Sequence, residues 1–94
     1  MHGVIGRINA KPGMRDELLT TLGSGTGRLP GCLSYIVARD IDAGDVIWVT
    51  EIWENAAAHA AALRLPQVKE TIARVRPMMI GIERVATTHV TSGL

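Results

Sequence analysis

The sequence predicts an α+β fold, and three observations over its 94 residues support this expectation. Both ends of the chain have the residue pattern of strands, two extended segments flank a tight turn in the middle, and helical segments separate the outer strands from this central pair. The resulting order is βαββαβ. Two βαβ units joined by a hairpin form the ferredoxin-like sandwich, a four-stranded antiparallel sheet with both helices on one face.

The first strand and helix follow from periodicity. Residues 2–10 alternate between two sets of side chains, which is typical of a strand, and the turn sequence KPG ends this segment. Met14, Leu18 and Leu22 then recur at four-residue spacing with mostly polar residues between them. This spacing predicts an amphipathic helix that ends in the glycines after Leu22.

The middle of the chain predicts a hairpin. The sequence LPG precedes an extended segment over residues 32–41, and DAGD turns the chain back into a third strand over residues 46–53. Because a parallel connection needs a long crossover, this short turn makes the two strands antiparallel neighbours.

The second helical region has two parts. An alanine-rich helix follows the third strand and is interrupted near Pro66. A second helical piece presents Val68, Ile72 and Val75 on one face, and a proline closes it. Residues 82–91 are rich in β-branched side chains and predict the last strand.

Length and composition limit the class of protein. We expect one domain over residues 1–94. A hydrophobic content of 47% and a net charge of +1 are not typical of disordered chains or of proteins that bind phosphate backbones. Cys32 is the single cysteine, and no apolar stretch approaches the roughly 20 residues of a membrane span. We therefore expect a cytoplasmic protein that binds neither nucleic acid nor membranes.

The third strand predicts a partner for the sheet. A sheet covered by helices on one side should be polar on the other, yet both faces of residues 46–53 are largely apolar. The two sets are Val46, Trp48 and Ile52 on one face and Ile47, Val49 and Trp53 on the other. The simplest partner is a second copy packed sheet to sheet about a two-fold axis. The alternative is a second face that is partly exposed to water.

The junction of the third strand and the alanine helix carries the residues that we associate with chemistry. Trp53 ends the strand, and His59 shares a helix face with small residues. A pocket walled by Ala and Leu, with an indole and an imidazole, suits a small flat aromatic substrate. An imidazole with a pKa of about 6.5 accepts a phenolic proton at neutral pH. The alternatives are a solvated His59 and a Trp53 that only fills the core.

Other polar residues are less distinctive. Glu51 lies on the same strand face as Trp53 and could orient His59, but an ion pair with Arg7 or Arg84 across the sheet is the preferred interpretation. Further polar candidates are Asn9, Ser34, Tyr35 and Arg76.

No metal site is expected. The histidines are far apart in sequence, and no Cys/His spacing matches a zinc site. Residues 40–51 have acidic residues at the two ends of a calcium-loop spacing, but Gly44 and Asp45 stand in reversed order and Trp48 occupies a ligand position. We interpret this segment as a hairpin turn.

Four segments resemble the antibiotic biosynthesis monooxygenase family, and in particular its small quinol monooxygenases. They are KPGMRDEL, PGCLSY, TEIWENAAAHAAALRLPQVKE and RPMMIG. The resemblance covers nearly the whole chain. It implies a dimeric α+β barrel in which each protomer has a pocket between sheet and helices. In the family's oxygenases, molecular oxygen reacts there with an electron-rich phenol, quinol or anthrone without flavin, haem or metal.

The resemblance also implies roles for individual residues. Trp53 matches the family's tryptophan at the end of the third strand. Members that oxidise aromatic polyketides have an asparagine and a tyrosine where this chain has Val49 and His59, and many quinol-type relatives have a histidine where this chain has Ala62. The implied function is cofactor-free oxidation of a small quinol or phenol, with molecular oxygen as co-substrate and His59 as the candidate proton acceptor.

The expected catalytic residues are therefore His59 and Trp53. The expected substrate-binding residues are Val49, Glu51, Asn9, Ala62, Ile72 and Arg76. Haem degradation, another activity found on this fold, is disfavoured because the asparagine, tryptophan and haem-ligating histidine of those proteins match Gly6, Ala62 and Ile72 here.

Two other functions remain open. One is an isomerase or lyase that acts on a small carbonyl or phosphorylated compound, which a cationic clamp of Arg7, Arg76 or Arg84 in the pocket would favour. The other is a non-enzymatic dimeric barrel with a binding or stress-associated role.

Overall fold

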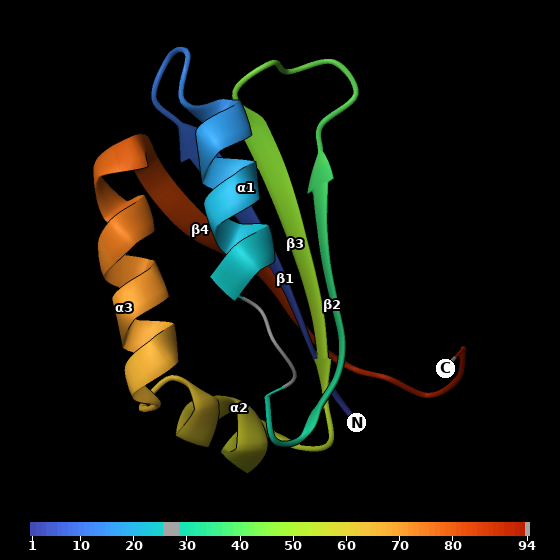
Figure 1. The fold of residues 1–94 in the computed structure, drawn as a ribbon. Coiled ribbons are helices and arrows are strands. Elements are labelled where there is room, and N and C mark those ends of the chain that lie inside the picture. The colour runs from blue at the N-terminus through green and yellow to red at the C-terminus, as the bar shows by residue number, and fades with distance from the viewer. Residues whose placement is uncertain (26–28, 94) are drawn as a thin grey trace.

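The computed structural model describes residues 1–25 and 29–93 of the chain. Figure 1 shows one sheet with the helices packed on one of its faces, and the expected α+β ferredoxin-like fold is confirmed. Within these residues, no helix has both the length and the apolar character to span a membrane. The strands are β1 (His2–Ala10), β2 (Cys32–Arg39), β3 (Val46–Trp53) and β4 (Met79–His89), and the helices are α1 (Arg15–Gly25), α2 (Ala56–Ala62), α3 (Pro66–Val75) and the short 3-10 helix η1 (Arg76–Met78).

The strands pair antiparallel in the order β2-β3-β1-β4, so β1 and β3 occupy the centre of the sheet. Residues directly opposite one another across antiparallel strands place their side chains on the same face. The helix-facing side therefore consists of rows that run across the sheet. Three of these rows, from the α2 end toward the middle, are Trp53–His2–His89, Tyr35–Glu51–Val4–Thr87 and Val37–Val49–Gly6–Arg84.

A hydrophobic core joins the sheet to α1 and α3. Leu18 of α1 and Ile47 of β3 are completely buried, and Val75 of α3 packs into the same cluster. The four-residue spacing that predicted the first helix accounts for its two buried leucines, Leu18 and Leu22. Burial of these apolar side chains holds the two helices on one face of the sheet.

The segment with calcium-loop spacing at its ends is a hairpin turn, as predicted. The carboxylate of Asp40 accepts hydrogen bonds from the backbone N–H of Ala43 (2.8 Å), the indole of Trp48 (2.8 Å) and the backbone N–H of Asp42 (2.9 Å). These hydrogen bonds lower the pKa of Asp40 to about 2. Because Asp40 already turns the chain, β2 ends at Arg39, two residues before its predicted end.

The last strand begins earlier than predicted. β4 starts at Met79, three residues before residue 82, because Met79 already pairs with Ala10 of β1. Just before it, the carbonyl of Met78 accepts a hydrogen bond of 2.9 Å from the N–H of Lys11. Propensity alone did not reveal this pairing, since it depends on where η1 returns the chain to the sheet.

The face of the sheet turned away from the helices carries apolar and charged side chains together. Ile36 of β2 is 56% exposed, and Trp48 of β3 is partly buried. Arg7 of β1 and Glu83 of β4 are cross-strand partners whose side chains form an ion pair, with 2.8 Å between Arg7 Nη2 and Glu83 Oε1. We call this surface the open face.

Candidate active site

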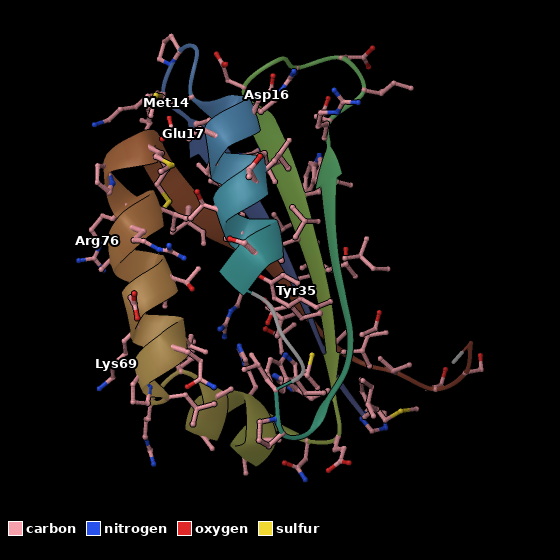
Figure 2. The ribbon with its side chains drawn as sticks, in the orientation of Figure 1. Met14, Asp16, Glu17, Tyr35, Lys69 and Arg76 are labelled. Carbon is pink, nitrogen blue, oxygen red and sulfur yellow. The ribbon has the colours of Figure 1, made fainter. Side chains whose placement is uncertain are left out.

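A cavity of about 490 Å³ lies between the helix-facing side of the sheet and the helices. Its lining comes from all the strands and from α1, α2 and α3, and most of the lining side chains are aliphatic. Gly6 leaves space in the floor, because a Cβ added there would meet only the carbonyl oxygen of Glu83, at 3.7 Å. Tyr35, labelled in Figure 2, projects from β2 into the same space. The volume lies in the range of small-molecule sites, about 300–1,000 Å³.

Helix α2 is fixed at one end of this cavity by its cap and by a close contact. The side chain of Asn55 accepts a hydrogen bond of 2.8 Å from the N–H of Ala58 and so caps the N-terminus of the helix. Gly31 has a φ of 78°, and a Cβ added to it would lie 2.6 Å from the Cβ of Ala58. Glycine and alanine therefore allow a close approach that directs His59 and Ala62 inward, where both are buried.

Glu51 connects the two aromatic residues at the junction of β3 and α2. The indole Nε1 of Trp53 donates a hydrogen bond of 3.1 Å to Glu51 Oε1, and His59 Nε2 lies 3.7 Å from the same oxygen. The rings of Trp53 and His59 also contact each other, with 5.1 Å between their centroids. Trp53 is 1% exposed and His59 is 8% exposed. The structure therefore brings an indole, a carboxylate and an imidazole together at one end of the cavity.

The ion pair expected between Glu51 and Arg7 or Arg84 is not formed. Arg7 lies on the open face and pairs with Glu83, because it alternates with Gly6 and Ile8, which face the helices. Arg84 faces the cavity but belongs to the next row along the sheet from Glu51. The prediction failed for Arg7 because the sequence does not show which face of β1 the helices cover, and for Arg84 because it does not show the register between the strands.

The surroundings of His59 favour the neutral form of its imidazole. Burial lowers the pKa of His59, the carboxylate of Glu51 acts in the opposite direction, and the positive charge of Arg84 and the imidazole of His2 add to the lowering. The ring of His2 lies 5.8 Å from that of His59 between centroids. A neutral imidazole has a lone pair available, so His59 is suited to accept a proton.

Tyr35 is a further polar group of the cavity. Burial, and then the charge of Glu51, raise the pKa of Tyr35 to about 12, so its phenol remains protonated and can donate a hydrogen bond. Tyr35 is directly opposite Glu51 across the hairpin. The sequence identifies Tyr35 only as one polar candidate among several, because counting back across the predicted turn at residues 42–45 places Ile36, and not Tyr35, opposite Glu51.

Most of the residues expected at the site line this cavity. Those that do are Val49, Glu51, Trp53, His59, Ala62, Ile72 and Arg76. Asn9 does not, because it alternates with the buried Ile8 and Ala10 and so faces away from the helices. Sequence reasoning did not mention Thr71, which is buried in the lining and donates its hydroxyl to the carbonyl of Gln67 in its own helix, at 3.0 Å. Within residues 1–25 and 29–93, no three His, Cys, Asp or Glu side chains gather as a metal-ligating group.

The fold and the site define an α+β protein with a cavity between its sheet and its helices. The chain belongs to the antibiotic biosynthesis monooxygenase family, whose profile matches residues 1–74. None of the curated proteins matches it.

Solved structures agree with this assignment. A crystal structure from Chloroflexus aurantiacus J-10-fl, provisionally named an antibiotic biosynthesis monooxygenase, is 41% identical over 99% of this chain and 95% of its own, with a TM-score of 0.93. Provisionally named monooxygenases from Deinococcus radiodurans (22% identity, 100% and 96% coverage, TM-score 0.81) and Nitrosomonas europaea (13%, 98% and 100%, TM-score 0.85) share the fold.

The lowered pKa of His59 predicts a pH-dependent stability. The unfolded chain binds a proton at His59 more readily than the folded chain. The contribution of neutral His59 to the free energy of unfolding is therefore complete above the ordinary pKa of about 6.5. It is lost as the pH falls through that value toward the lower pKa of the folded state. We expect the free energy of unfolding, from urea titrations at about pH 7.5 and about pH 5.5, to fall more for the native protein than for His59→Gln. The exposed His89→Gln variant serves as the control and should lose as much as the native protein. An equal loss in native and His59→Gln protein would contradict the prediction.

Proposed function

We propose that the protein is a cofactor-free monooxygenase that oxidises a small quinol or other phenolic aromatic with molecular oxygen. Membership of its family points to monooxygenase-like chemistry. The observation that carries the finer proposal is the 3.7 Å approach of His59 Nε2 to Glu51 Oε1, beside Trp53 and inside a largely aliphatic cavity. This arrangement supplies a base and a flat wall for an aromatic ring.

His59 accepts the proton of a substrate hydroxyl in this proposal. Its imidazole is neutral before the transfer and positive after it, and the nearby carboxylate of Glu51 stabilises the positive form. The N–H of Trp53 holds that carboxylate in place, while the indole ring offers a surface for stacking. Tyr35 remains a phenol and donates a hydrogen bond to the substrate anion.

The reaction needs no external reductant. The deprotonated ring transfers an electron to molecular oxygen, and the resulting radical and superoxide combine at a ring carbon that carries hydrogen. The C–H bond at that carbon and the O–O bond of the peroxide then break, and one oxygen remains as a carbonyl. The other oxygen leaves with the C–H proton as hydroxide, which takes the proton held by His59 and becomes water. Oxidation of the C–H bond and of the quinol to a quinone together supply all the electrons that the oxygen molecule takes up.

A second candidate function rests on the two arginines of the lining. Arg76 and Arg84 are both lining residues of the cavity, which is the observation expected of an isomerase or lyase that acts on a small carbonyl or phosphorylated compound. Such an enzyme would consume no oxygen, so oxygen uptake distinguishes the two functions.

Oxygen uptake tests the monooxygenase directly. Metal-free protein without added cofactor is offered hydroquinones, naphthohydroquinols and anthrones in an oxygen electrode, with autoxidation subtracted. We expect uptake above this background, and we expect His59→Ala to reduce it about 100-fold because the base is lost. His89→Ala removes an exposed histidine outside the cavity lining and should leave the rate unchanged. Uptake that His59→Ala does not change would refute the role of His59, and no uptake from any compound would refute the monooxygenase.

The open face supports a second proposal, that two chains associate sheet to sheet as a homodimer. Ile36 is 56% exposed there, and Val85 of β4 is 48% exposed. The Nε atom of Arg7 is buried on the same side and has no hydrogen-bond partner among the residues that the structure describes. A buried donor without a partner is costly, and a second chain provides both apolar cover and acceptors.

Sedimentation tests the dimer. We expect the native protein to sediment at twice the chain mass of 10.1 kDa. Ile36→Lys should shift it to the monomer because the change places a charge on the open face. Ile41→Lys introduces the same charge in the hairpin turn, where Ile41 is 95% exposed, and should leave the dimer intact. A native monomer, or an Ile36→Lys variant that remains dimeric, would contradict the sheet-to-sheet arrangement.

A further inference from the structure

Two of the residues that line the cavity are arginines, and both are exposed. Arg76 at the end of α3 and Arg84 of β4 are both lining residues. Within residues 1–25 and 29–93, neither side chain forms a hydrogen bond or an ion pair. Guanidinium groups that face an aliphatic cavity are suited to a ligand that brings its own negative charge.

The acidic residues of the lining are engaged elsewhere. Glu83 pairs with Arg7 at 2.8 Å on the open face, and Glu51 accepts the hydrogen bond of Trp53 and faces His59. The positive charges of Arg76 and Arg84 are therefore not neutralised within the cavity. One end of the lining therefore carries the carboxylate of Glu51 and the imidazole of His59, and a second region carries the positive charges of Arg76 and Arg84.

The register of the sheet separates these two regions. Trp53 is opposite His2, Glu51 is opposite Val4, and Arg84 is opposite Gly6. Arg84 is therefore about 7 Å along β1 from Glu51 and about 13 Å from Trp53. Arg76 lies further in the same direction, because the strand that follows it opens with Met79 opposite Ala10. Gly6 has no side chain, so the floor between the regions is open.

We infer that Arg84 and Arg76 form an anion-binding subsite of the cavity, and that the ligand is a flat aromatic with a hydroxyl at one end and a carboxylate or similar anionic oxygen group at the other. The orientation of the hydroxyl toward His59 rests on the proposed function. Binding of the anionic group by the two arginines is independent of that function. The charge of Arg84 also reaches His59, where it helps to lower the pKa of the imidazole.

Calorimetric titration with two matched probes tests the subsite. The probes are 6-hydroxy-2-naphthoate, which has its hydroxyl and carboxylate at opposite ends, and 2-naphthol, which lacks the carboxylate. Anaerobic solutions keep the measurement independent of oxidation. We expect the native protein to bind the naphthoate at least about tenfold more tightly, because a charge-assisted pair is added.

Substitutions assign this preference to the arginines. Arg84→Ala should reduce the preference for the naphthoate to about twofold or less while leaving the affinity for 2-naphthol unchanged, and Arg84→Lys should restore part of it. Arg74→Ala removes an arginine from an exposed position of α3 outside the lining and should keep the full preference. Equal affinity of the native protein for both probes would overturn the inference, and so would an undiminished preference in both Arg84→Ala and Arg76→Ala.

The anion-binding subsite and the monooxygenase activity can be rejected independently of each other. Tight, Arg84-dependent binding of the naphthoate with no oxygen uptake from any quinol would retain the subsite and reject the oxidation chemistry. Oxygen uptake that depends on His59, together with equal binding of the two probes, would retain the chemistry and reject the subsite.

Discussion

The carboxylate of Glu51 is partly buried in a largely aliphatic cavity, and the arrangement of the site depends on how this charge is satisfied. A buried carboxylate is costly unless donors or cations surround it. The indole N–H of Trp53 supplies one hydrogen bond, and His59 approaches the same oxygen from α2. The strand that carries Glu51 and Trp53 and the helix that carries His59 must therefore meet at one corner of the cavity.

Small residues make this meeting possible. Gly31 and Ala58 allow α2 to pack closely against the loop before β2, and Ala62 gives the helix a thin wall toward the cavity. Gly6 leaves the floor of the cavity open. The alanine-rich stretch after β3 therefore positions His59 and keeps the cavity open. Larger side chains would move His59 away from Glu51 or fill the volume beside it.

Local patterns in the sequence were sufficient for the fold and for part of the site. The bounds of β1 and β3 agree with the predicted ranges, and the alanine-rich helix after β3 brings His59 beside Trp53. The partner of Glu51 was not predictable, because it depends on which face of each strand the helices cover and on the register between strands. Asn9 was wrongly expected in the cavity because the covered face of β1 was not known. Tyr35 was not recognised as the neighbour of Glu51 because the register between β2 and β3 was not known.

Titration of the His59 ring protons by NMR, in the native protein and in Glu51→Gln, tests the account most directly, with the resonances assigned from single histidine variants. Burial lowers the pKa of His59 and Glu51 opposes this, so the account predicts a native pKa below the ordinary value of about 6.5 and a still lower pKa in Glu51→Gln. A native pKa at or above that value, or one that Glu51→Gln leaves unchanged, would contradict a neutral proton acceptor supported by the carboxylate of Glu51.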